Sequence, residues 1–232
     1  MKSKVSIQSI FLLLLTFITI SCSKNNEWVR NGLHGKVKSI NEKYYDAENK
    51  FGAWTYGDSS SYGLIHYSFT NKGDYNGTEY YDNGKLCFKY IPKHKDGKLI
   101  EVCQYDQDGK LINNMKINQI SAEVEEATSF DENGLKKSKC KSYYKNNIFI
   151  GGEDSIFEKG KPNGKKIGKA AIDSKGNIQS YLVVDEKGKE ESYKRFEYLE
   201  FDKMNNWIKR ISFSSRNSKK PNNLIIREIE YY

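Results

Sequence analysis

Histidine and carboxylate side chains are considered first, because they carry most acid–base and metal chemistry in proteins. The chain has three histidines, His34, His66 and His94, and no two of them lie at i, i+4 spacing. Adjacent acids occur at Glu125-Glu126 and Glu190-Glu191. Two carboxylates can hydrolyse a glycosidic bond only when they flank a cleft, about 5 to 9.5 Å apart. Because nothing in the sequence predicts a cleft, we expect no enzymatic activity, no cofactor and no metal site.

Two glycine-containing loops come near known ligand-binding patterns without matching them. Asp106-Gln107-Asp108-Gly109 begins like a calcium loop, but the third acid and the terminal Glu are missing. Gly164 to Lys169 has one residue too few between its glycines for a phosphate loop, and no Ser or Thr follows the lysine. Both loops are therefore interpreted as turns.

Of the four cysteines, we expect Cys22 to be modified and the other three to be inert. Cys87, Cys103 and Cys140 show no C-x-x-C spacing, which argues against a zinc or dithiol redox site. At most one disulfide can form among three thiols, and Cys87 and Cys103 are candidates to pair across neighbouring strands. We expect all three to behave mainly as buried small apolar residues. Cys22 has a different context.

The first 22 residues have the features of an export signal. Lys2 and Lys4 precede an uncharged run from Ile10 to Ile20, which is shorter than the roughly 20 residues of a membrane-spanning helix. The run ends at Thr19-Ile20-Ser21-Cys22, which resembles the lipobox of bacterial lipoproteins. The resemblance implies cleavage after Ser21 and acylation of Cys22. An ordinary cleaved signal is the alternative. We expect a cell-envelope protein that this anchor holds to the outer membrane. The sequence leaves open whether the protein lies on the periplasmic or the outer face of that membrane.

Charge supports an exported, water-exposed surface. Lys and Arg number 38 against 30 Asp and Glu, and mean hydropathy is −0.78. Removal of residues 1–21 takes away two lysines, so the mature excess is 36 minus 30, or +6. The excess is spread thinly, whereas a nucleic-acid reader concentrates its basic residues on one stripe. We therefore expect no nucleic-acid partner.

The rest of the chain repeats one short phrase, an aromatic or aliphatic residue followed by Asp-x-x-Gly-Lys-Leu. It occurs in full at Tyr105 to Leu111, one residue shorter at Tyr81 to Leu86, and with small changes up to Phe201 to Trp207. An Asp that opens a turn bonds to the backbone ahead of it, and Gly at the end adopts the left-handed conformation. Asn205 stands where a Gly is expected, and Asn is the next residue able to adopt that conformation. The phrase predicts a hairpin turn about every dozen residues.

Between these turns the side chains alternate with period two. Leu86, Phe88 and Tyr90 fall on one face, as do Ile65, Tyr67 and Phe69, which is typical of half-buried antiparallel strands. We expect an all-β fold: a repetitive antiparallel β-meander, elongated and twisted, able to curl into an open barrel. Helix competes with strand only over residues 121–128, and residues 223–232 form the last strand.

The repeated phrase resembles the YD repeats of RHS-type proteins and the related repeats of MORN-like bacterial proteins. With Gly32 to Lys38 and Asn206 to Arg210, the chain is similar to lipoproteins of Bacteroidetes-type bacteria. The domains expected are a signal peptide (1–21), an acylated cysteine and linker (22–31) and one β-repeat domain (32–232).

The resemblance implies a non-catalytic binding or scaffold role in the envelope, with a protein or glycan partner. An immunity or antitoxin-like protein that neutralises a toxin at the envelope is the alternative hypothesis. An envelope glycan hydrolase is a third, supported only by the abundant acids. A turn motif specifies structure rather than function, so the sequence does not decide among them.

Overall fold

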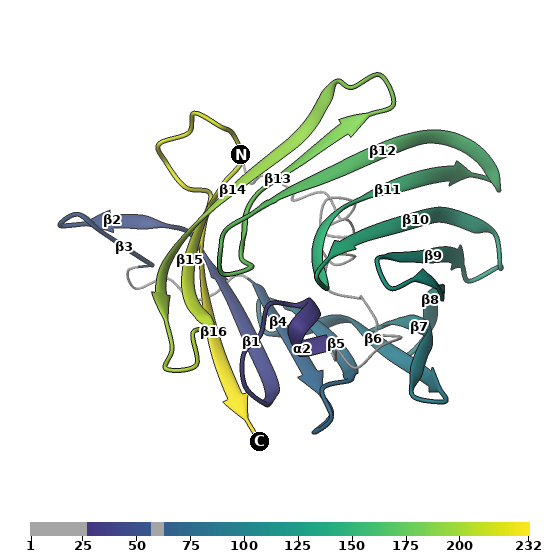
Figure 1. Cartoon of the computed structure of the whole chain (residues 1–232), viewed down its shortest axis with the longest axis horizontal. Coiled ribbons are helices and arrows are strands. Elements are labelled where there is room, and N and C mark those ends of the chain that lie inside the picture. The colour runs from purple at the N-terminus through teal and green to yellow at the C-terminus, as the bar shows by residue number, and fades with distance from the viewer. Residues whose placement is uncertain (1–26, 57–62) are drawn as a thin grey trace.

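The computed structural model describes residues 27–56 and 63–232, which form one short helix and sixteen strands. Fourteen of the strands close into an antiparallel barrel (Figure 1). The predicted signal peptide and Cys22 lie outside the described residues. The elements are α2 (Glu27–Arg30), β1 (Val37–Tyr45), β2 (Glu48–Lys50), β3 (Ala53–Thr55), β4 (Gly63–Phe69), β5 (Tyr75–Asp82), β6 (Lys85–Lys95), β7 (Lys98–Asp106), β8 (Leu111–Ser121), β9 (Val124–Asp131), β10 (Lys136–Lys145), β11 (Ile148–Glu158), β12 (Lys161–Ile172), β13 (Ile178–Asp185), β14 (Glu190–Phe201), β15 (Trp207–Phe213) and β16 (Asn223–Tyr231).

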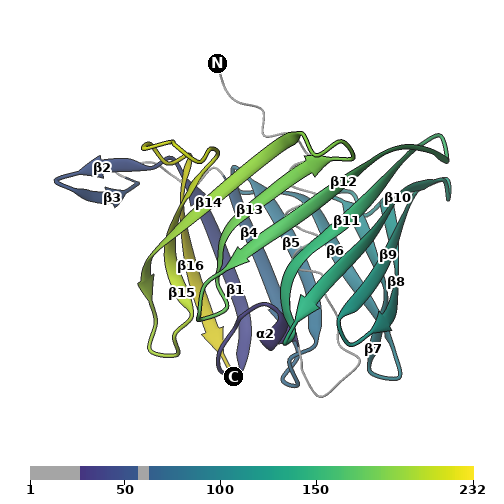
Figure 2. The ribbon, with the colours of Figure 1, turned by 45° about the horizontal axis from the view of Figure 1, so that its top comes forward.

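The barrel is a simple meander that closes on itself. From β4 to β16 each strand pairs with the next in sequence, and β1 lies between β4 and β16 (Figure 2). Pairing of β1 with β16 places Ile40 opposite Ile229. The predicted all-β meander is confirmed, and its curl is complete rather than partial. Closure removes the unpaired strand edges that an open sheet would leave exposed.

The repeated phrase forms the turns that were predicted. The Asp106 amide donates to the Lys110 carbonyl, and Asp106 Oδ1 accepts from the Asp108 and Lys110 amides. The same pattern recurs at Asp131, Asp173, Asp185 and Asp202. Asn205 has a φ of 65°, which confirms that it substitutes for glycine in its turn.

Other hairpins use tighter turns. Asn83-Gly84 and Asp96-Gly97 both have positive φ at both positions, as two-residue hairpin turns require. Residues 121–128 form a turn followed by strand β9, so the competition between helix and strand in this segment is resolved as strand. Within residues 27–56 and 63–232, no helix has the length and apolar character needed to cross a membrane.

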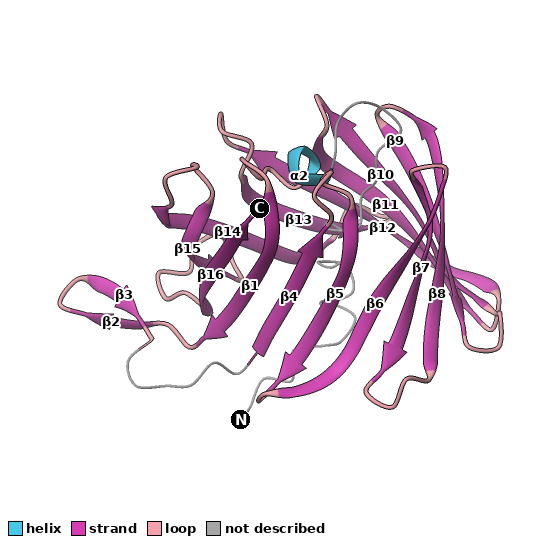
Figure 3. Ribbon diagram, turned by 90° about the horizontal axis from the view of Figure 1, so that it is seen from below, coloured by secondary structure: helices cyan, strands magenta, loops and turns pink. Residues whose placement is uncertain are grey.

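A small hairpin, β2–β3, stands away from the barrel (Figure 3). Its Trp54 packs with Ile211, Phe213 and Leu224, which are buried on the outer side of β15 and β16. The hairpin therefore shields an apolar strip of the outer wall from water.

Helix α2 shows which side chains face the inside of the ring. Trp28 packs against Ile40 of β1 and Ile65 of β4, whereas Arg30 pairs with Glu125 of β9. These strands lie on opposite sides of the ring, so α2 spans its interior (Figure 1). These α2 residues fall within the segment 22–31 that the sequence suggested as a linker.

Side chains alternate along a strand, so residues two positions apart lie on the same face of the sheet. On β6, Tyr90 belongs to an inner cluster with Val102 and Met115, and Phe88 packs against it. The predicted common face of Phe88 and Tyr90 is therefore the inner one, whereas Leu86 lies beyond a register shift, opposite Tyr81. The hydrophobic core of this protein lines the inside of its barrel.

Candidate functional site

A buried ion pair joins the two strands that close the barrel. Glu42 of β1 and Arg227 of β16 are direct cross-strand partners on the inner face. Arg227 donates to Glu42 Oε1 from Nε at 2.7 Å, and its Nη2 lies 2.6 Å from the same oxygen. The Tyr44 hydroxyl donates to Glu42 Oε2 at 2.9 Å. Burial alone would raise the pKa of Glu42, but the charges of Arg227 and Arg210 outweigh burial and lower it.

A second arginine, Arg210 of β15, lies beside this pair. Its guanidinium carbon is 4.0 Å from the Trp207 ring centroid and 4.6 Å from that of Phe196. Arg227 approaches the same Trp207 ring at 3.5 Å, so the indole packs against two cations. Cation–aromatic contacts of this kind are stronger when water is excluded. We call Glu42, Lys194, Trp207, Arg210 and Arg227 the inner charged cluster.

Lys194 of β14 brings a third cation to this part of the lumen. Its strand partner is Tyr181, an inner residue of the hydrophobic cluster around Phe149. Burial and the nearby charge of Arg210 both lower the pKa of Lys194. The cluster therefore holds three basic groups and one carboxylate.

A cavity adjoins the cluster on the side of Arg227. It is a small hollow of about 10 Å³, room for about one water molecule, and Arg227 is its one charged lining residue among those described. The other lining residues come from the segment after α2 and from β1, β4 and β5: Asn31, Leu33, Ile40, Tyr67, Phe69 and Tyr75. The hollow therefore marks a place where aromatic rings meet one cation on the inner wall.

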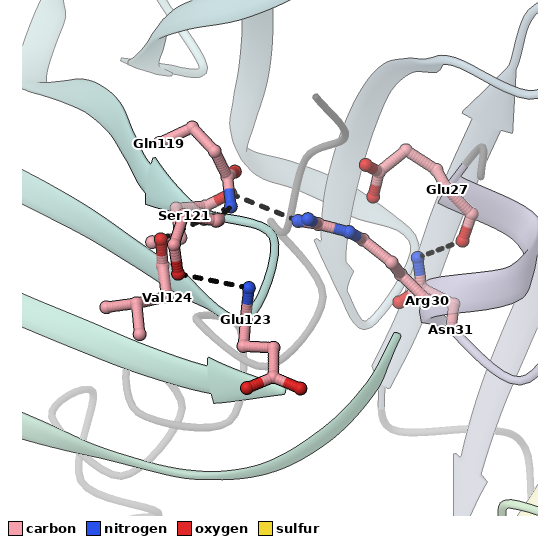
Figure 4. Close-up of polar contacts among 8 residues, drawn as sticks. Glu27, Arg30, Asn31, Gln119, Ser121, Glu123 and Val124 are labelled. Carbon is pink, nitrogen blue, oxygen red and sulfur yellow. Dashed lines mark hydrogen bonds and ion pairs between the residues drawn. The ribbon is translucent and has the colours of Figure 1, made fainter. Parts of the chain in front are cut away.

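The α2 segment is held across one end of the barrel by polar contacts (Figure 4). Arg30 Nη1 donates to Glu125 Oε2 at 3.2 Å, and the two side chains are only 2 % and 3 % exposed. The Arg30 guanidinium also lies 4.6 Å from the Tyr144 ring centroid. Figure 4 shows Arg30 extending from α2 toward the β8–β9 hairpin.

The chain after α2 is fixed to the opposite wall. Asn206 Nδ2 donates to the His34 carbonyl and to the Tyr231 hydroxyl, at 2.8 and 2.7 Å. The His34 amide donates back to Asn206 Oδ1. Residues 27–34 are therefore tied to two facing walls of the barrel, and we call this segment the plug.

Asp154 of β11 is an inner carboxyl without such support. It lies opposite Cys140 on β10, and its Oδ1 is buried with no hydrogen-bond partner among the described residues. Burial raises the pKa of Asp154 to about 6, and the Lys166 charge offsets only part of this effect. Burial, with the nearby Asp154 charge, raises the pKa of the Cys140 thiol to about 12.

The outer wall of the barrel carries many ion pairs between neighbouring strands. Cross-strand ion pairs occur on it around the ring: Lys43–Glu228, Lys93–Glu101, Lys139–Glu126, Lys165–Glu153 and Lys209–Glu200. Each joins neighbouring strands through side chains that alternate with inner residues. Barrels embedded in a bilayer instead present an apolar band about 25 Å tall to lipid.

The acids considered from the sequence do not converge. Glu125 faces inward to Arg30, while its neighbour Glu126 faces outward to Lys139. Glu190 pairs with Arg216, and Glu191 pairs with Lys166.

The three histidines lie apart: His34 near Asn206, His66 bonded to Asn41 on the outer face, and His94 near the end of β6. Among the described residues, no group of three or more His, Cys, Asp or Glu side chains could hold a metal ion.

The three described cysteines are free thiols. Cys87 and Cys103 lie on the paired strands β6 and β7, as the sequence suggested, but Cys103 is opposite Ile91, four residues from Cys87. Four strand residues span about 13 Å, well beyond the 7 Å Cα separation that a disulfide tolerates. Cys103 and Cys140 are buried, and Cys87 is half-buried, so the expectation of burial is met fully by only two of them.

Sequence reasoning missed the inner charged cluster, although a signal for it exists. Glu42 lies between Ile40 and Tyr44 on the apolar face of its strand, and Arg227 lies between Ile225 and Ile229 on the apolar face of the last strand. A charge of each sign at apolar positions of two strands is the pattern of a buried pair.

Comparisons with known proteins include a distant structural similarity. No protein-family model and no curated protein matches the chain. The solved crystal structure of a porin-like protein from Bacteroides uniformis is similar over 84 % of this chain and 96 % of that one, with 10 % sequence identity and a TM-score of 0.43. A similarity this weak says nothing about function.

Proposed function

We propose that this protein is a lipid-anchored β-barrel of the cell envelope, whose barrel stands in water and binds a glycan or protein partner without catalysis. The observation that carries the proposal is the ion-paired outer wall. Charged pairs around the ring are stable next to water, but in hydrocarbon each charge at mid-depth would cost about 2–4 kcal/mol. Membrane attachment must therefore come from elsewhere in the chain.

Cys22 supplies that attachment in this proposal. Its lipobox-like context implies acylation by two or three chains, which suffices for stable anchoring, whereas one chain gives only marginal binding. Such a protein is most simply an outer-membrane lipoprotein.

The binding role is supported by the lumen. A ring of fourteen strands is wider than a ring of eight, whose interior the side chains just fill, and this width favours a lumen that admits a ligand. Tyr67 and Tyr75 line the cavity together with Arg227. Aromatic rings and arginine are suited to the faces and polar groups of sugars, which favours a glycan over a folded protein domain.

The inner acids do not favour hydrolysis. Glu42 is occupied by Arg227 and Tyr44, and Glu125 is buried against Arg30. A glycosidase needs one carboxyl as an acid and a second that is free to act as a base or nucleophile. The immunity hypothesis has no observation in its favour among the described residues.

The anchoring is tested by fractionating cells that express the full chain. Wild type should pellet with membranes and enter detergent, while Cys22→Ala should become water-soluble and keep its β-sheet circular dichroism spectrum. Cys87→Ala, which removes a different cysteine, should fractionate like wild type. If Cys22→Ala stays in the membrane and resists alkaline extraction, the barrel itself is embedded and the proposal is wrong.

A further inference from the structure

We propose that the inner charged cluster binds the anionic group of a ligand, a carboxylate or phosphate, against Arg210 and Lys194. This inference deepens the binding role proposed above. It rests on that role but not on the lipid anchor.

The first step is the balance of charge. Arg210, Arg227 and Lys194 face Glu42 alone within the cluster, so full ionisation leaves an excess of two positive charges. Arginine stays protonated in proteins. Arg210 and Arg227 are each 5 % exposed, so water screens them little.

The second step is that Glu42 makes its ion pair with Arg227 and not with Arg210. Its Oε1 accepts from Nε and Nη2 of Arg227, and its Oε2 accepts from the Tyr44 hydroxyl. Among the described residues, Arg210 has no carboxylate within ion-pair distance, and its Nε is buried without a hydrogen-bond partner. Burial alone would lower the pKa of Arg210, but the nearby Glu42 charge and a hydrogen bond with the Tyr198 hydroxyl raise it, so Arg210 is a charged group held at a distance from its nearest carboxylate.

Other nearby acids do not fill this role. Asp173, which lies close enough to Tyr198 to affect it, accepts hydrogen bonds from the backbone amides of Lys175 and Asn177 in its own turn. A buried cluster with more cations than carboxylates is destabilising, so an anion that balances the excess charge is bound favourably.

The third step is the shape of the surroundings. Phe196 and Trp207 pack against the guanidinium of Arg210, which holds its plane in place. A ligand would therefore contact Arg210 through its N–H groups, at the edge of the guanidinium plane. A fixed guanidinium is suited to the two oxygens of a carboxylate or phosphate. Lys194 faces the same lumen from β14, four residues before Tyr198, the strand partner of Arg210, and a long ligand could reach both cations.

The anion has two sources that the structure does not distinguish, a free inorganic oxyanion or an acidic sugar such as a uronic acid. The test is calorimetric titration of the mature chain, purified from membranes in neutral detergent, at constant ionic strength with chloride as the balancing anion. The probes are inorganic phosphate, glucuronate, and glucose as the neutral sugar. Saturable binding of phosphate alone indicates a free oxyanion, and tighter binding of glucuronate with none of glucose indicates an acidic sugar.

The matched variants are Arg210→Met and Lys209→Met. These neighbours on β15 each lose one positive charge, but Lys209 faces outward, where it pairs with Glu200. Arg210→Met should weaken binding about tenfold or more, because a charge-assisted contact is lost, whereas Lys209→Met should stay within about twofold of wild type.

If Arg210→Met does not fold, Lys194→Met replaces it, with an expected loss of about threefold or more. Absence of phosphate and glucuronate binding in wild type would overturn the inference, as would equal losses in Arg210→Met and Lys209→Met. Neither result would affect membrane anchoring, which the Cys22→Ala fractionation decides separately.

Discussion

Asp154→Asn should stabilise the protein at neutral pH, because it removes a buried carboxyl that lacks a hydrogen-bond partner for Oδ1. The pKa of Asp154 is raised from 3.8 to about 6 in the folded barrel. In the window between these values the folded state binds more protons than the unfolded state. Stability contributed by this group is therefore present at low pH and falls as pH rises toward and past 6.

The size of the effect follows from the shift. A difference of about two pKa units at about 1.4 kcal/mol per unit gives a loss of about 3 kcal/mol between pH 4 and pH 8. Asparagine does not titrate, so the variant escapes this loss. Other carboxyls, such as Glu42 and Glu153, have lowered pKa values and act in the opposite direction. The informative quantity is thus the difference in unfolding free energy between variant and wild type at each pH.

Urea denaturation followed by circular dichroism measures that difference. The unfolding free energy of Asp154→Asn minus that of wild type should increase by about 3 kcal/mol from pH 4 to pH 8. Asp96→Asn is the matched control, because Asp96 lies in an exposed turn with a φ of 52° that asparagine also adopts. A flat difference for Asp154→Asn, or an equal slope for Asp96→Asn, would refute the explanation by burial.

Two further predictions concern the plug and the thiols. Arg30→Met should lower the free energy of unfolding, measured by urea denaturation, by about 3–5 kcal/mol, because it leaves Glu125 charged and buried. Adding Glu125→Gln should restore much of the loss. An undiminished loss in the double variant would mean that Arg30 acts through packing. Brief maleimide treatment should label Cys87 well before Cys140, because burial raises the pKa of the Cys140 thiol to about 12. Mass spectrometry measures the labelling of each cysteine. Equal labelling would show that the inner wall opens readily.

The local structure of the hairpins could be predicted from sequence because their information is local. Asp106 and its equivalents specify a turn through bonds to amides two and four residues ahead. The φ of Asn205 follows from the same rule. Alternation over a strand such as Gly63–Phe69 likewise assigns faces without knowledge of distant residues.

Closure and the inner cluster depend on distant residues, so local patterns do not determine them. Glu42 and Arg227 are 185 positions apart, and they meet only because β1 pairs with β16 in one particular register. A shift of β1 by one residue would turn Glu42 outward and bury Lys43 beside Arg227 instead. The plug escaped prediction for another reason: four helical residues give too short a pattern to detect.

The register of the closing strands also explains why the cluster is retained at a cost in stability. Hydrophobic residues of similar size are often as stable as a buried ion pair or more so. Ile40 and Ile229 would pack equally well in several alignments, whereas Glu42 finds its partner in one. We therefore expect Glu42→Leu combined with Arg227→Leu to keep a folded barrel but to loosen the β1–β16 seam, visible as faster amide exchange in those two strands than in β6 and β7. Unchanged exchange at the seam would mean that the cluster serves ligand binding alone.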